Sequence, residues 1–187
     1  YSMTEPQGGS DPTALECLAV EDGDQFVING EKWFSTNARY STFLIVMVVT
    51  DPDAAPHQKM SMFLVPTDTP GVKIIRNIGL GFERPGEGSH AYIEYENVRV
   101  PKENMLGARG QAFAVSQVRL GGGRVHHSMR SVGMIRTALD MMCKRALSRK
   151  TKGETLAQKQ LVQEKIADSW IQLEQFRLLV LQTAWKI

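Results

Sequence analysis

The residues of this chain best suited to chemistry are the hydroxyls and glycines at its start. Residues 1–11, the opening loop, read Tyr-Ser-Met-Thr-Glu-Pro-Gln-Gly-Gly-Ser-Asp. Thr4 and Ser10 offer hydroxyl donors, Gly8 and Gly9 let the backbone approach a flat or charged group, and Pro6 fixes the chain direction. An isolated Gly-Gly-Ser is usually a surface turn. The longer run of hydroxyls indicates a loop that holds a ligand.

Two later segments have a similar mixture of side chains. Residues 33–37, the aromatic segment, read Trp-Phe-Ser-Thr-Asn and combine aromatic faces with hydroxyls. Residues 149–153, the basic turn, read Arg-Lys-Thr-Lys-Gly. By itself the basic turn reads as a charged connection between two helices.

Composition limits the class of protein. The 187 residues are 42% hydrophobic and 22% charged, as in an ordinary globular protein. A net charge of +2 and the lack of a basic block argue against nucleic acid as a partner. The longest apolar run, residues 43–49, is far below the roughly 20 residues of a membrane helix. Cys17 and Cys143 lack metal spacing, as do His126 and His127, so we expect neither a disulfide nor a metal site.

The first part of the chain has the pattern of short strands. Asn29-Gly30 is a strong hairpin signal, and turns are expected at 21–24 and 69–71, with loops at 51–56 and 84–88. The predicted strands cover residues 15–20, 25–28, 31–35, 42–50, 59–66, 72–76, 90–95 and 98–101. Six to eight such strands predict a small barrel or sandwich over residues 1–107.

The second part, residues 108–187, has the pattern of helices. We expect a helical segment over 112–120, a break or kink at Gly121-Gly122-Gly123, and a helix that continues to about Ser148. Another helix should begin near Ala157. The expected buried residues are Val125, Met129, Val132, Ile135, Leu139 and Met142, then Leu161, Ile166, Trp170, Leu173, Leu178 and Trp185. The predicted fold class is therefore α+β, with a β domain followed by an α-helical hairpin.

These segments, in this order, resemble the acyl-CoA dehydrogenase family of flavoenzymes. The opening loop is similar to the family's flavin loop, written T-E-P, a small residue or two, then G-S-D. The aromatic segment is similar to W-I-T-N-G, and the basic turn to R-x-x-F-G. Residues 101–107 are similar to the V-P-x-x-N-x-L-G join between the two domains. The resemblance implies a middle β domain and the first part of a C-terminal four-helix bundle.

The resemblance also implies which residues bind FAD. In the family the flavin loop lies along the isoalloxazine, the second strand reaches the flavin N5 region, and the arginine and hydroxyl of the third motif meet the pyrophosphate across a subunit interface. Phe34 replaces the family tryptophan, and Lys152 replaces a phenylalanine. The cofactor-binding residues so implied are Tyr1, Met3, Thr4, Gly9, Ser10, Phe34, Ser35, Thr36, Arg149, Thr151 and Gln160. We therefore expect Thr4 and Thr36 to converge on one flavin-sized face.

Substrate contacts follow from the same resemblance. Residues 120–124 fall where the family has a helix segment that touches the CoA thioester and ends in arginine. A branch of the family with the pattern Leu-Gly-x-Gly-Arg-x-His-His, associated with large acyl groups, resembles residues 120–127 better. The implied substrate-binding residues are Ser10, Gly121, Gly122, Gly123 and Arg124.

The implied reaction is α,β-dehydrogenation of an acyl-CoA thioester in fatty-acid or related β-oxidation. The implied partners are an electron-transfer flavoprotein and further copies of the chain in a homodimer or homotetramer. The implied location is the cytoplasm in a bacterium, or the mitochondrial or peroxisomal matrix in a eukaryote. The family base is a glutamate, and no residue here can be assigned that role, so the chain is expected to be an inactive fragment. Two alternatives stay open: an oxidase, monooxygenase or damage-response flavoprotein of the same fold, and a non-enzymatic interaction module.

Overall fold

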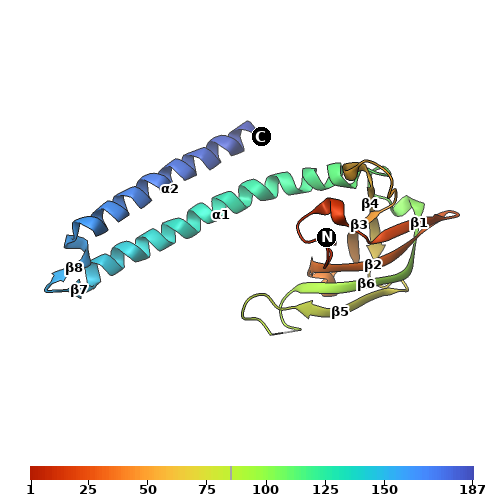
Figure 1. Cartoon of the computed structure of the whole chain (residues 1–187), viewed down its shortest axis with the longest axis horizontal. Helices are drawn as coiled ribbons and strands as arrows, with labels where there is room; N and C mark the ends of the chain where they lie inside the picture. Colours follow the sequence, from red (N-terminus) through yellow and green to blue (C-terminus); the bar gives the residue numbers. More distant parts are fainter. Residues whose placement is uncertain (85) are drawn as a thin grey trace. The chain divides into compact units, whose positions relative to one another are not determined.

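A computed structural model describes residues 1–84 and 86–187, which form two compact units, Tyr1–Gln117 and Val118–Ile187 (Figure 1). Most of the regular structure of the first unit is strand, and most of the second unit is formed by two long helices. The predicted α+β class is confirmed. Pro85, part of the loop expected at 84–88, lies outside the described residues.

The first unit is built on a six-stranded sheet with the order β4-β3-β1-β2-β6-β5. Its neighbouring strands pair antiparallel, except that β1 meets β3 in parallel at Leu18 and Val49. The strands are β1 (Leu18–Asp22), β2 (Gln25–Thr36), β3 (Phe43–Val49), β4 (Met60–Pro66), β5 (Val72–Ile78) and β6 (His90–Pro101). Alternate residues of β2 and β6 face a shared apolar core, in which the rings of Phe26 and Phe63 lie 4.9 Å apart.

The expected hairpin at Asn29-Gly30 is wrong. β2 runs unbroken through both residues, and the chain turns instead at Asp22-Gly23-Asp24, where Gly23 has a φ of 66°. Gly30 is a glycine for a different reason, because a Cβ there would lie 2.7 Å from the Cα of Cys17, in the segment just before β1. The short-range turn signal was overridden by pairing of β2, which meets β1 over Gln25–Asn29 and β6 over Gln25–Thr36.

Two irregularities interrupt the pairing of β2 with β6, and they compensate for each other. Between the pairs Ile28–Val98 and Gly30–Tyr95, β6 carries one extra residue. Between Lys32–Ile93 and Ser35–Ala91, β2 carries one extra residue, so the original register returns. The extra residues bring a positive φ to Asn97 (51°) and to Phe34 (55°). β-Bulges of this kind change which way a side chain points.

The second unit shows that the break expected at Gly121-Gly122-Gly123 is wrong. α1 (Ala112–Ser148) is one continuous helix, and a Cβ added at any of the three glycines would meet nothing within 4 Å. Three glycines cost the helix about 1 kcal/mol each relative to alanine. Helical turns that continue on both sides offset this cost, since elongation is much easier than nucleation.

A short connection joins the two helices of the hairpin. The strands β7 (Lys150–Thr151) and β8 (Glu154–Thr155) pair in it, and a 3-10 turn over Leu156–Gln158 follows. Thr155 and Gln158 form a capping box there, so α2 (Gln160–Lys186) begins slightly later than the residue expected from the sequence.

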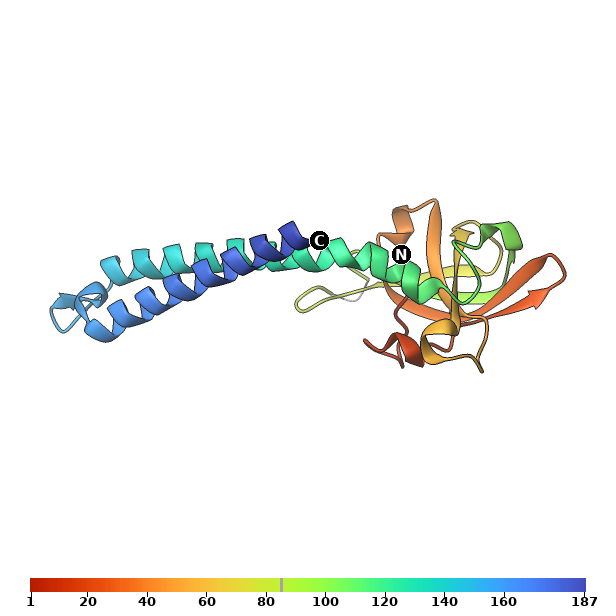
Figure 2. The same ribbon diagram turned by 90° about the horizontal axis from the view of Figure 1, so that it is seen from above.

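α1 and α2 run side by side in opposite directions in both views (Figure 2). Their contact buries Val132 and Leu139 of α1 against Leu173 and Val180 of α2, with Val125, Met129, Met142 and Ile166 at its edges. Several other expected core residues are exposed instead, because two helices can bury only one stripe of each other. They are Ile135, Leu161, Trp170, Leu178 and Trp185. Within the described residues, no helix combines the length and the apolar character needed to cross a membrane.

Candidate functional site

The opening loop lies against the sheet beside the aromatic segment. Ser2 exchanges backbone hydrogen bonds with Ile45 and Met47 of β3, and the Thr4 carbonyl accepts from the Trp33 N–H at 3.0 Å. The Ser2 and Ser35 hydroxyls are 2.7 Å apart. The two segments predicted to share a ligand are therefore neighbours in the fold, although they are far apart in the sequence.

A buried ion pair ties the loop to β2. The Lys32 ammonium lies 2.6 Å from Glu5 Oε1, and the two side chains are 0% and 1% exposed. Lys32 also donates to the Met3 carbonyl at 2.8 Å. Burial lowers the pKa of Lys32, because a low-dielectric surrounding disfavours the charged form.

Glu5 in turn holds both ends of the loop that follows it. Its Oε1 accepts from the Cys17 N–H at 3.0 Å, and its Oε2 accepts from the Glu16 N–H and from the Gln7 side chain, each at 2.6 Å. The sequence analysis missed this role. The available signal was the spacing in β2, because Lys32 is in phase with the buried residues Phe26 and Ile28.

A second set of buried polar groups, the hydroxyls of Ser2, Ser35 and Tyr95, joins the opening loop to the core. The Tyr95 hydroxyl donates to Ser2 Oγ at 3.3 Å, and Ser2 bonds to Ser35. Burial raises the pKa of the Tyr95 phenol. The hydroxyl of Ser35, a predicted cofactor-binding residue, is thus 1% exposed and engaged inside the unit. Any contact it makes with a ligand must use its backbone.

Phe34 and Thr36, by contrast, are exposed. The Phe34 ring is 38% exposed, sits on the bulge in β2 and has a φ of 55°, a conformation that strains any residue with a side chain. The Thr36 hydroxyl lies 2.8 Å from His90 Nδ1 on the paired strand β6. His90 was missed, because only the β2–β6 pairing brings it beside Thr36.

One buried donor in this region lacks an acceptor. Trp33 Nε1 has no hydrogen-bond partner among residues 1–84 and 86–187. Its ring packs on Phe34 with the centroids 4.8 Å apart. A buried N–H without a partner is uncommon, and it can signal a missing acceptor.

The remaining predicted residues of the opening loop lie close together. The Tyr1 hydroxyl contacts Met3 Sδ at 3.8 Å, and both side chains are half-buried against a second apolar cluster. Gly9 has a φ of 54°, and a Cβ there would meet nothing in the described part of the chain within 4 Å. Ser10 follows it and is exposed. The loop thus presents a glycine and a hydroxyl at its surface.

Arg149, Thr151 and Gln160 are all placed at the connection between α1 and α2. The Arg149 carbonyl accepts from the Leu156 N–H at 2.9 Å, Thr151 belongs to β7, and Gln160 is the first residue of α2. Arg149 and Thr151 are exposed. A phosphate-bearing ligand could reach both.

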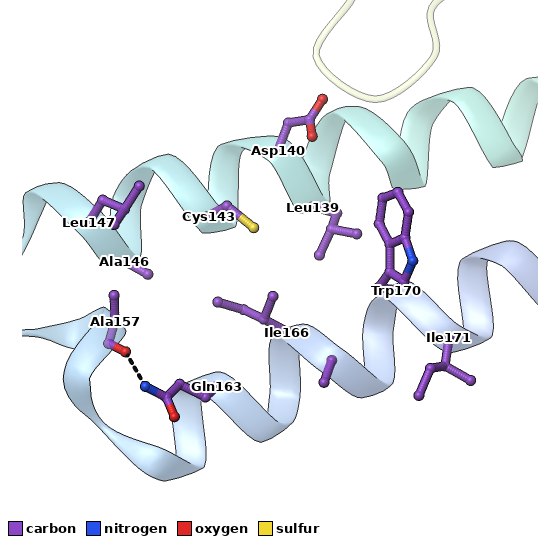
Figure 3. A pocket seen from close by; sticks show the side chains of 11 residues that line it. Leu139, Asp140, Cys143, Ala146, Leu147, Ala157, Gln163, Ile166, Trp170 and Ile171 are labelled. Atoms are coloured by element: carbon purple, nitrogen blue, oxygen red, sulfur yellow. Dashed lines mark hydrogen bonds between the residues drawn. The ribbon is translucent and has the colours of Figure 1, made fainter.

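Gly121 and Arg124 line a cavity of about 400 Å³ between the two helices. Its other lining residues are mostly apolar: Val125, Ser128, Phe176, Leu179, Val180, Thr183 and Ile187. Gly122 and Gly123 do not line it. A larger cavity of about 630 Å³ lies nearer the connection, where Leu139, Cys143, Ile166 and Trp170 project between the helices (Figure 3).

Comparison with known proteins identifies the family. Residues 1–98 match the middle domain of acyl-CoA dehydrogenases, and residues 110–187 match the C-terminal domain of acyl-CoA dehydrogenases. The chain belongs to the acyl-CoA dehydrogenase family. Members of this family are oxidoreductases that carry FAD.

Individual relatives agree with this assignment. The probable acyl-CoA dehydrogenase FadE2 of Mycobacterium tuberculosis is 45% identical over all of this chain and 46% of its own length. Acyl-CoA dehydrogenase family member 11 of Gallus gallus is 40% identical over all of the chain and 25% of its own length. The structure of butyryl-CoA dehydrogenase from Megasphaera elsdenii superposes with a TM-score of 0.83 at 29% identity, over 99% of this chain and 48% of that one. The chain therefore spans half or less of the length of these relatives.

Proposed function

We propose that this chain contributes the FAD site and part of the acyl-CoA site of a protein that dehydrogenates acyl-CoA thioesters between the α and β carbons. The observation that carries the proposal is the pairing of the opening loop with the aromatic segment, through the Trp33 N–H and the Thr4 carbonyl and through Ser2 and Ser35. Both segments match flavin-contacting motifs of the family.

The residues present suit a flat aromatic ligand with polar edges. Phe34 offers an exposed ring, Thr36 an exposed hydroxyl, and Gly9 an open backbone. Trp33 Nε1 is a buried donor that has no acceptor in the described part of the chain. Rings that stack and donors that point at ring heteroatoms are what an isoalloxazine needs.

FAD, when bound, supplies the redox chemistry by accepting the β hydrogen as hydride. The chain's own share is to bind and orient. Thr4 and Thr36 would offer hydroxyls to the flavin, with Tyr1, Met3, Gly9, Ser10, Phe34 and Ser35 around them. Arg149, Thr151 and Gln160 would hold the pyrophosphate of FAD in another copy of the chain. No residue here is assigned as the base that removes the α proton.

The helical unit supports a substrate role. The cavity beside Gly121 and Arg124 is mainly apolar and has one guanidinium in its lining, which suits an acyl chain next to a polar thioester. Gly122 and Gly123 are the other substrate-binding residues proposed in α1, and Ser10 is the one proposed in the opening loop. The exposed apolar side chains of α1 and α2 favour assembly into a homodimer or homotetramer.

The electron acceptor would be an electron-transfer flavoprotein, as is usual for this family. Relatives come from a bacterium and from a vertebrate, so the proposed location is the cytoplasm in the first case and the mitochondrial or peroxisomal matrix in the second.

Replacing Thr36 tests the proposal in the intact protein. Thr36→Val removes the hydroxyl at nearly constant volume, and we expect weaker FAD binding and a change in the visible flavin spectrum. Thr42→Val, at another exposed threonine of the same unit, is the matched control. Turnover is measured with a panel of acyl-CoA thioesters and an artificial electron acceptor, while oxygen uptake tests for an oxidase. A wild-type protein that binds no FAD would refute the proposal.

A further inference from the structure

The hydrogen bonds of the buried ion pair between Glu5 and Lys32 go to the opening loop and to the residues just before β1. Isolated ions are costly to bury, and an apolar pair of similar volume is often as stable. Besides each other, the two charged side chains bond to four groups: the Met3 carbonyl, the Gln7 side chain and the Glu16 and Cys17 N–H groups. All of these partners lie in or next to the opening loop.

We propose that Glu5 and Lys32 are positioning residues for the opening loop, and that they fix the orientation of the Met3–Thr4 peptide on which FAD affinity depends. The inference rests on the proposed function. It assigns to an ion pair inside the first unit an effect on a ligand that neither side chain touches.

The geometry explains how the pair can act. Lys32 extends from β2, an interior strand of the six-stranded sheet, and its backbone is paired with that of Ile93 in β6, so its position is set by the sheet. Its ammonium holds the Met3 carbonyl, and the Trp33 N–H holds the Thr4 carbonyl. With the carbonyls before and after the Thr4 Cα both fixed, the direction of the Thr4 side chain is fixed as well. No peptide in the described residues is cis, so the Thr4 N–H points away from Lys32.

The carboxylate of Glu5 closes the other side of the loop. Gln7 donates to it from just after Pro6, and the Glu16 and Cys17 N–H groups donate to it from just before β1. One side chain thereby joins both ends of residues 7–16, which include Gly9 and Ser10. Charge-assisted bonds to a buried carboxylate are stronger than neutral ones, so this closure should be rigid.

Three variants of the intact protein separate positioning from stability. Lys32→Met leaves the Glu5 carboxylate buried without its cation, Glu5→Gln leaves the ammonium without its anion, and the double variant removes both charges. Lys73→Met is the matched control, because Lys73 pairs with Glu96 at the exposed surface of the same unit. The readouts are amide hydrogen exchange at Glu16 and Cys17, thermal unfolding, and FAD affinity from quenching of flavin fluorescence.

We expect exchange at Glu16 and Cys17 to be about 100-fold faster in Lys32→Met, as for other broken buried pairs. The double variant should recover most of the unfolding temperature, because no lone charge remains buried. Its FAD affinity should stay about 10-fold or more below that of the wild type, because the Met3 carbonyl still lacks its donor. Lys73→Met should match the wild type in all three readouts.

Two results would overturn the inference. Unchanged exchange at Glu16 and Cys17 in Lys32→Met would show that the pair does not hold the loop, whatever the flavin measurement gives. Wild-type FAD affinity in the double variant would show that the pair serves stability alone. If the wild-type protein binds no FAD, the proposed function fails, while exchange still decides whether the pair orders the loop.

Discussion

The strained backbone at Phe34 predicts that glycine is more stable than alanine at this position, which is the reverse of the order at ordinary strand positions. Phe34 lies on the β2 bulge with a φ of 55°. A residue with a Cβ is strained there by roughly 1–2 kcal/mol, whereas glycine is not. In an ordinary strand, glycine is less stable than alanine by roughly 0.5–1 kcal/mol. At position 34 the two effects oppose, so Phe34→Gly should be more stable than Phe34→Ala by about 0.5–1 kcal/mol.

Equilibrium urea unfolding of both variants, followed by the fluorescence of Trp33 in the strand-rich unit, measures this difference. Both variants lose the aromatic ring, so comparing them cancels the lost packing. Val20 in β1 is the control, since it is 54% exposed and does not have a positive φ. There alanine should be more stable than glycine. An alanine variant at position 34 as stable as the glycine variant, or more so, would refute the claim of strain. Both Phe34 variants should bind FAD more weakly than the wild type.

Three further outcomes are expected. Arg109 bonds to the Asp51 carboxylate and holds its pKa below the usual value. The resulting stabilisation is present above about pH 4 and is lost as the pH falls further. Arg109→Met should therefore make the unfolding temperature depend less on pH between about pH 2 and pH 5. Gly122→Ala should stabilise α1 by about 1 kcal/mol, because alanine favours a helix and the added methyl meets no neighbour. Thermal unfolding followed by the helical signal in circular dichroism measures this gain, and an unchanged unfolding temperature would contradict it. Leu139→Ala should cost about 2–5 kcal/mol of helix-pair stability, whereas Leu161→Ala, at a residue 69% exposed, should cost about 0.5 kcal/mol or less in urea unfolding of the 187-residue chain.

The sequence predicted the fold class and the juxtaposition of the two hydroxyl-rich segments, because motif order and hydrophobic spacing are local properties. It failed where partners at a distance decide the structure. Asn29-Gly30 has the local preference of a turn, but pairing of Asn29 with Leu18 and of Gly30 with Tyr95 keeps it inside β2. The glycines at 121–123 are a different case, because they have the preference of a break but the helical turns on both sides continue through them.

The Glu5–Lys32 pair was missed for a related reason. A lysine usually indicates an exposed position, and its partner lies 27 residues away along the chain. In α2 the error was the reverse, because apolar residues that were expected to be buried are exposed. Hydrophobic spacing identified a buried stripe correctly at Leu173 but counted Leu178 and Trp185 in it, although two helices alone do not cover them.

The paired bulges in β2 and β6 have a consequence for how this protein can change over evolutionary time. Each bulge is one extra residue, so losing one residue at positions 33–34 would leave Ser35 opposite Ala91 and Lys32 opposite Ile93, with the ladder regular between them. Losing one residue near Asn97 would likewise leave Ile28 opposite Val98 and Gly30 opposite Tyr95. Losing a residue of β2 between the two bulges would instead shift Lys32 by one position and turn its side chain to the other face of the sheet. Deletions in descendants of this sequence should therefore occur at the two bulges and not in the segment of β2 between them.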